Sequence, residues 1–302
     1  MWSEPPCEIL ESLELLGTWP NCLYLLKGKE AMIVGGGMSW TAPALERQFA
    51  AMDFDFSRIR YLVISHSHFD HCGAVPYLKR KFPQAKILAS AYAQRVFSLK
   101  KAVQFIAAMN DRMIEKAGMG KEAERLALKF DGIQVAQTIA EQDLVDLGNG
   151  ITVRFLETPG HTQCSLAAYV PSLKILFPSD AAAFPTFDGK GPAHPSPQYD
   201  FRLYLESLKK LSALEVEILA FEHHGFLRGA GARQFLIQAL EVAEEDRKFI
   251  TENIRNPEDF EAVAQKLAGD FLEQTRLPFL PPEIQRDVAA TVVRKILEAG
   301  RE

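Results

Sequence analysis

The chain is poor in cysteine, and its cysteines do not form a pattern that would cross-link a small fold through disulfides. Four of its 302 residues are cysteines, and Cys7, Cys22, Cys72 and Cys164 are scattered, with no CxxC pair. A disulfide framework is therefore not expected, and a reducing cytoplasm is the compartment that fits best. Cys72 and Cys164 are interpreted as small buried packing residues.

Long apolar runs and blocks of like charge are also missing. No apolar run approaches the ~20 residues that a membrane-spanning helix needs. The stretch MWSEPPCEILESLELLGTW lacks the basic start and uninterrupted apolar segment of a secretion signal. The net charge of −5 leaves no basic footprint for a nucleic acid. We therefore expect a cytoplasmic protein with no membrane or nucleic-acid partner.

Two sets of short apolar runs predict strands. They lie at residues 22–26, 31–36, 61–65 and 86–90, and then at 144–148, 151–157, 165–170, 174–179 and 216–221. Several are continuous runs with β-branched residues, which is typical of strands covered on both faces. Gly148-Asn149-Gly150 and Pro171-Ser172-Leu173 separate neighbouring runs and indicate hairpins.

Helical patterns lie between the strands and fill the C-terminal part of the chain. A long helix is expected over about 92–117, inside a helical insert at about 92–130. Beyond residue 230 the patterns predict only helices, at 230–253, 257–273 and 282–299. We expect a mixed α/β domain over 1–229, carrying a helical cap over 230–302.

The stretch VISHSHFDHCG, residues 63–73, crowds four ligand-type side chains at the end of a predicted strand. In extended backbone His66 and His68 point to the same side and can hold one metal ion. Asp70 and His71 follow where the strand gives way to a helix, so they would aim at a neighbouring point. One short loop can thus serve two metal ions, and a solvated polar turn explains it poorly.

More ligand-type residues follow other predicted strands. His161 lies in ETPGHTQCS, Asp180 in FPSDAA, and His223 and His224 in AFEHHG. Among the seven histidines, only His194 in the Pro-rich loop GPAHPSP lies outside these strand ends. A lone histidine of this kind is usually a packed core residue. Six of them at strand ends instead indicate one shared site.

Counting donors gives two metal sites joined by a carboxylate. His66, His68 and His161 can hold one ion, while Asp70, His71 and either His223 or His224 hold the other, with Asp180 as the bridge. These nitrogen and oxygen donors suit Zn, Fe or Mn. Two ions about 3.5–4 Å apart can share a water, lower its pKa and present the bridging hydroxide to a carbonyl. Asp70 would both bind a metal and orient that nucleophile.

The motif HSHFDH resembles the HxHxDH signature of the metallo-β-lactamase superfamily, and PGHT, PSDAA and EHHG match its later ligand positions. The resemblance implies a four-layer αβ/βα sandwich with a dinuclear site at one edge. HCGAVPYLKRKFPQAKILAS, YLESLKKL, FLRG and FLPPE also look like the quinolone-signal response subgroup, the PqsE-like thioesterases. That subgroup implies a helical C-terminal extension closing over the metals and an association with iron.

Two departures from the superfamily bear on the site. Glu222 precedes the last histidine where glycine is usual. Aligning on FLRG selects His223 and aligning on the trailing His-Gly selects His224; we favour His223. The tyrosine that the lactonase branch often carries after its bridging aspartate is absent, and Phe184 follows an alanine run instead. An apolar acyl or aromatic small molecule suits such a site better than the lactones of that branch.

The leading hypothesis is a dinuclear metallo-hydrolase acting on an ester-like bond, most plausibly an acyl thioester. A second hypothesis is an iron-dependent oxidoreductase or dioxygenase of the same fold. A third is a regulatory metal-binding protein that acts through its helical cap. The sequence leaves both a monomer and a homodimer open.

Overall fold

The computed structural model describes residues 4–189, 191 and 193–300. Its first sheet contains seven strands in chain order: β1 (Cys7–Leu10), β2 (Leu13–Thr18), β3 (Asn21–Lys27), β4 (Ala31–Val34), β5 (Ile59–Val63), β6 (Lys86–Ala89) and β7 (Gln137–Thr138). Strands β1 to β4 pair antiparallel, whereas β4 to β7 pair parallel. The parallel strands therefore end at the same edge of the sheet.

The second sheet contains six strands in the order β13-β12-β11-β10-β9-β8. Their bounds are β8 (Leu144–Asp146), β9 (Thr152–Glu157), β10 (Leu166–Val170), β11 (Ile175–Phe177), β12 (Ile218–Ala220) and β13 (Phe226–Arg228). All neighbours pair antiparallel except β11 and β12. The two predicted hairpin turns join β8 to β9 and β10 to β11, as expected.

Side-chain alternation along the strands builds three apolar clusters, one between the sheets and one on the outer face of each. In β3, Tyr24 and Leu26 face the second sheet, while Leu23 and Leu25 face the helices outside. In β10, Ala168 faces the first sheet and Tyr169 the opposite helices. Both faces of each sheet are thus covered, which explains the nearly continuous apolar runs of the sequence.

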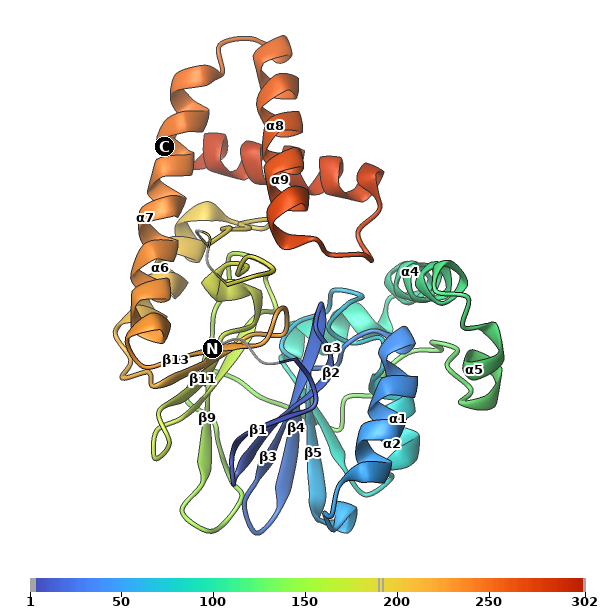
Figure 1. Cartoon of the computed structure of the whole chain (residues 1–302). Helices are drawn as coiled ribbons and strands as arrows, with labels where there is room; N and C mark the ends of the chain where they lie inside the picture. The colour runs from blue at the N-terminus through green and yellow to red at the C-terminus, as the bar shows by residue number, and fades with distance from the viewer. Residues whose placement is uncertain (1–3, 190, 192, 301–302) are drawn as a thin grey trace.

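Helices cover the outer faces of both sheets (Figure 1). Those on the first sheet are α1 (Ala42–Ala51), α2 (Val75–Lys81), α3 (Ala91–Ser98), α4 (Lys100–Lys116) and α5 (Gly120–Arg125), with short 3-10 turns at Ser39–Thr41 and Phe56–Arg58. The helix on the second sheet is α6 (Phe201–Ser212). Asp200 caps its N-terminus, and the Asp200 side chain accepts a hydrogen bond from the Leu203 amide. The expected four-layer α/β sandwich is confirmed.

Three further helices complete the chain: α7 (Ala230–Asn253), α8 (Pro257–Thr275) and α9 (Pro282–Ala299). They stand over one edge of the sandwich (Figure 1). Phe235 and Leu236 of α7 share an apolar cluster with Leu208 of α6. The helical C-terminal region is confirmed. Its first helix, α7, packs on α6 of the sandwich, and the domain division at residue 229 stays a prediction.

The predicted long helix over 92–117 is wrong in one respect. The helix breaks at Leu99, which has extended backbone and a half-exposed side chain, at 51%. Apolar periodicity runs through the break because α3 and α4 both bury a face in the same cluster. No helix of the described residues is long and apolar enough to cross a membrane.

Candidate metal centre

The loop between β5 and α2 carries the HSHFDH motif and is held from both ends. The Ile64 amide donates to the Leu88 carbonyl, and the Gly73 amide donates to the Gly37 carbonyl. At Gly36 a Cβ would lie 2.3 Å from the His71 carbonyl oxygen. Only a glycine allows this close approach, which presses the loop against the strand end of β4.

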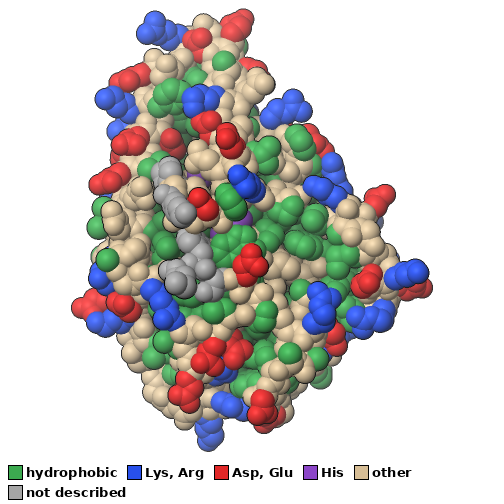
Figure 2. Space-filling view, viewed as in Figure 1, with side chains coloured by type: hydrophobic (Ala, Val, Ile, Leu, Met, Phe, Trp, Pro, Cys, Tyr) green, Lys and Arg blue, Asp and Glu red, His purple; other side chains and the backbone are tan. Residues whose placement is uncertain are grey.

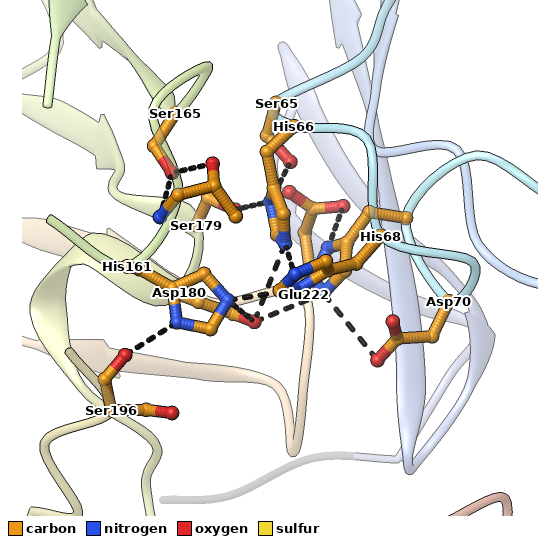
Figure 3. A network of polar contacts seen from close by, with 12 residues as sticks. Ser65, His66, His68, Asp70, His161, Ser165, Ser179, Asp180, Ser196 and Glu222 are labelled. Carbon is orange, nitrogen blue, oxygen red and sulfur yellow. Dashed lines mark hydrogen bonds and ion pairs between the residues drawn. The ribbon is translucent and has the colours of Figure 1, made fainter. Parts of the chain in front are cut away.

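The first donor group joins the two histidines of the loop to residues of the second sheet (Figure 3). His68 Nδ1 lies 3.1 Å from His66 Nε2 and 3.0 Å from His161 Nε2. Asp180 Oδ2 lies 3.3 Å from His161 Nε2 and 3.7 Å from His66 Nε2. Four donor atoms within 4.8 Å of one another can surround one ion.

The second donor group contains Asp70, His71 and His223. The Nε2 atoms of His71 and His223 are 3.1 Å apart, and Asp70 Oδ2 lies 3.6 Å and 3.7 Å from them respectively. Asp180 reaches this group as well, with Oδ2 3.1 Å from His71 Nε2 and Oδ1 3.6 Å from His223 Nε2. A carboxylate thus lies between both groups, in the position expected of a bridge.

His224 lies apart from these donors. Its backbone adopts φ +60°, and its ring lies against Trp19, with centroids 5.9 Å apart. The left-handed conformation turns its side chain away from that of His223. The geometry therefore brings His223, and not His224, to the other donors.

Four of the five rings place Nε2 in the donor groups and engage Nδ1 in a second contact. The Nδ1 contacts are His66 with Ser179 Oγ (3.1 Å), His71 with Glu222 Oε2 (3.0 Å), His161 with the Ser196 carbonyl (2.7 Å) and His223 with the Pro20 carbonyl (2.8 Å). Such contacts fix the ring orientation and the tautomer that leaves Nε2 as the donor. His68 differs, because its Nδ1 faces the site.

Glu222 contacts the metal centre, a role that the sequence did not predict. In the sequence it was noted only as standing where the superfamily usually has glycine. Its carboxylate is buried, at 3% exposure, and pairs with His71 Nδ1. A carboxylate behind a ligand-type imidazole raises the basicity of the ring and orients it. The available signal was an acidic residue at the end of an apolar strand, where an unpaired charge would be costly.

Burial and neighbouring charges set the protonation of the donors. Burial lowers the pKa values of His66, His68 and His161, so these rings stay neutral and keep a lone pair. Burial also opposes the charged form of His71, but the carboxylates of Asp180, Glu222 and Asp70 outweigh it and raise its pKa. The pKa of Asp180 is lowered: burial alone would raise it, but His71 and His223 prevail.

Comparison with known proteins places this arrangement in a family. The family model of the metallo-β-lactamase superfamily matches residues 20–224, which contain every donor described above. The chain belongs to the metallo-β-lactamase superfamily.

Individual relatives of this metallo-β-lactamase superfamily member are distant. The metallo-β-lactamase fold-containing protein ST1585 of Sulfurisphaera tokodaii is 27% identical over 197 residues, covering 64% of this chain and 71% of that protein. The metallo-β-lactamase family protein TTHA1429 of Thermus thermophilus has a TM-score of 0.69 at 20% identity, covering 97% of this chain and 94% of that one. FEZ-1 metallo-β-lactamase of Legionella gormanii has a TM-score of 0.58 at 18% identity, covering 82% of this chain and 98% of that one. These structures share the fold.

A cavity of about 320 Å³ opens above the donors of this superfamily member. Its floor consists of His68, Asp70, His161 and Asp180. Its roof comes from the C-terminal helices: Val242 and Asp246 of α7, Leu267 and Asp270 of α8, and Val288 and Val292 of α9. Figure 2 shows histidine side chains among hydrophobic groups on this face. A small-molecule substrate fits such a concave, mainly apolar site.

Proposed function

We propose that this protein is a metal-dependent hydrolase that cleaves an ester-like bond, most plausibly an acyl thioester. The observation that carries the proposal is the pair of donor groups sharing Asp180 at the floor of an apolar cavity. The thioester is chosen because the sequence resembles the PqsE-like thioesterases, which also have a helical extension. Zn or Fe fits the donors best, and Mn is compatible with them.

The residues fit two divalent ions. His66, His68 and His161 would hold one, Asp70, His71 and His223 the other, and Asp180 would contact both. Such ions supply Lewis acidity, which activates water near neutral pH and stabilises an oxyanion.

The chain's own residues would position the reactants. The Asp70 side chain lines the cavity and is about 10% exposed, so its carboxylate can accept a hydrogen bond from the attacking water. Phe184 stacks on His223, with centroids 5.1 Å apart, and packs edge-on against Phe271. These rings shield one side of the donors from solvent and offer an apolar surface to an acyl or aromatic group.

Replacing Asp70 tests this function. We expect Asp70→Ala to abolish hydrolysis of a panel of acyl thioesters while thermal unfolding shows a folded protein. The exposed Asp53→Ala is a matched control, since Asp53 belongs to neither donor group and does not line the cavity. Unchanged turnover by Asp70→Ala would reject the proposal.

The metal content of protein purified without added metal separates the hydrolase from the oxidoreductase alternative. Two ions per chain are expected for the hydrolase. A single iron per chain, with the second donor group empty, would favour the mononuclear iron dioxygenase instead.

A further inference from the structure

Two polar side chains in the cavity wall contact each other without a well-formed hydrogen bond. His194 and Gln274 both line the cavity. His194 Nε2 and Gln274 Oε1 are shielded from solvent; the two side chains contact each other, but within the described residues neither atom makes a hydrogen bond of full geometry. Buried polar atoms are nearly always well paired, so a bound polar group that bridges these two side chains would complete their contacts.

Backbone hydrogen bonds hold both residues in place. The amides of His194 and Phe184 each donate to the other residue's carbonyl, at 2.9 and 3.0 Å. The Phe187 amide donates to the Gln274 carbonyl at 2.9 Å, which ties this segment to α8. The ring of His194 also packs on Phe271, with centroids 5.9 Å apart. The pair is therefore part of a defined wall.

The wall lies close to the floor. His194 is two residues from Ser196, whose carbonyl accepts from His161 Nδ1. Two residues of extended chain span at most about 7 Å. His194 and Ser196 both line the cavity whose floor is formed by the donors, so a group bound at His194 lies in the same cavity as a carbonyl bound at the floor.

The chemistry of the pair favours an uncharged ligand group. Burial lowers the pKa of His194, although Gln274 and then Asp270 oppose the shift, so the ring is neutral near pH 7. A neutral imidazole offers one donor and one acceptor, and the Gln274 oxygen accepts. The roof adds the carboxyl group of Asp246, which disfavours an anionic group, whereas that of Asp270 is paired with Lys266. A hydroxyl or an amide can donate and accept at once.

We propose that His194 and Gln274 recognise a hydroxyl or amide group carried by the substrate's apolar chain, in the same cavity as the bond that is cleaved. This inference rests on the proposed function for the cleavage itself. It defines the substrate as an acyl chain bearing an uncharged polar group, and it excludes chains bearing a carboxylate at that position.

Matched substrates test the inference. Phenyl thioesters of a decanoyl chain are compared with versions that carry a hydroxyl, or a carboxylate, at successive carbons. We expect one hydroxyl position to raise kcat/KM by roughly tenfold over the plain chain, the value of one good hydrogen bond. The carboxylate at that position should lower it below the plain chain.

Variants assign the preference to these residues. In His194→Phe and Gln274→Leu the ratio of hydroxylated to plain kcat/KM should fall to about one. Gln285→Leu is the matched control, because Gln285 lines the same cavity but its amide already donates to the Leu280 carbonyl. Its ratio should stay at the wild-type value.

Binding separates this inference from the hydrolase proposal. Ketone analogues that cannot be cleaved are titrated by calorimetry with the same hydroxyl positions. If the hydroxylated analogues bind more tightly and no thioester is hydrolysed, the inference about His194 and Gln274 holds and the hydrolase proposal is rejected. Equal affinity and equal kcat/KM at every position, or a preference that survives in both variants, would overturn the inference.

Discussion

The floor and the roof of the cavity are built in opposite ways. The floor gathers charged and polar groups from loops at strand ends, and most of its rings are held by a second hydrogen bond. The roof comes from packed helices and is mainly apolar, with the side chains of Asp246, Asp270, Gln274 and Gln285 as its polar groups. Chemistry is specified at one end and substrate choice at the other, so the two should respond separately to mutation.

The largest effect is expected at the floor, from Asp180→Asn. Asp180 contacts both donor groups, so loss of its charge should weaken the binding of both proposed ions and lower the proposed hydrolase activity by at least about a thousandfold. Elemental analysis should show fewer than two ions per chain. Full metal content with full activity would remove the basis for treating Asp180 as a bridge.

A smaller effect is expected one layer behind the floor, from Glu222→Ala. His71 would lose the carboxylate that orients it, and metal affinity at the second group should fall by about 10- to 100-fold in competition with a chelator. Glu222→Gln keeps an oxygen for the His71 N–H and should recover part of the affinity. The exposed Glu217→Gln serves as control. Affinity that is the same in all four proteins would show that Glu222 is only a packing residue.

The smallest effect is expected in the roof, from Asp246→Asn, and it concerns stability. Burial, Glu245 and Asp270 raise the pKa of Asp246 to about 6, with Lys266 opposing. The folded protein therefore binds this proton more tightly than the unfolded chain, and stability declines as pH rises from about 4 to 6. The Asn variant avoids this loss and should be more stable by about 1–3 kcal/mol near pH 8.

Urea unfolding at about pH 8 and about pH 4.5 measures this difference, with the exposed Asp53→Asn as control. The gain should be largest at the higher pH and about a third as large at the lower one. Equal effects at both values would show that the carboxyl group of Asp246 is not perturbed in the folded protein.

The sequence predicted the floor better than the roof because the floor depends on local chemistry. Ligand types at strand ends can be read from the chain, and parallel strands bring their ends to one edge. The choice between His223 and His224 needed the backbone conformation, since a positive φ at His224 cannot be read from two identical neighbours. The roof depends on how α7, α8 and α9 pack, which amphipathic patterns do not define.

Part of the fold was also beyond local patterns. Strand β2 reads LELLGT, whose leucines and glutamate favour a helix in isolation, yet it pairs with β3 along its whole length. The two-residue β7 is extended only because it borders β6. Tertiary pairing overrode propensity in both strands. The break at Leu99 was missed because both flanking helices keep the same apolar face.

The donors straddle the seam between the two sheets. His68 faces a partner 93 residues later in the chain, and His71 faces one 152 residues later. An ion seated there would act as a cross-link closing two long loops of chain, and loops of that size are entropically costly to close in a denatured ensemble. Neither half of the sandwich holds a complete coordination set, so metal binding should follow the packing of the two halves against each other. Removing the metal should first weaken the contact between the halves.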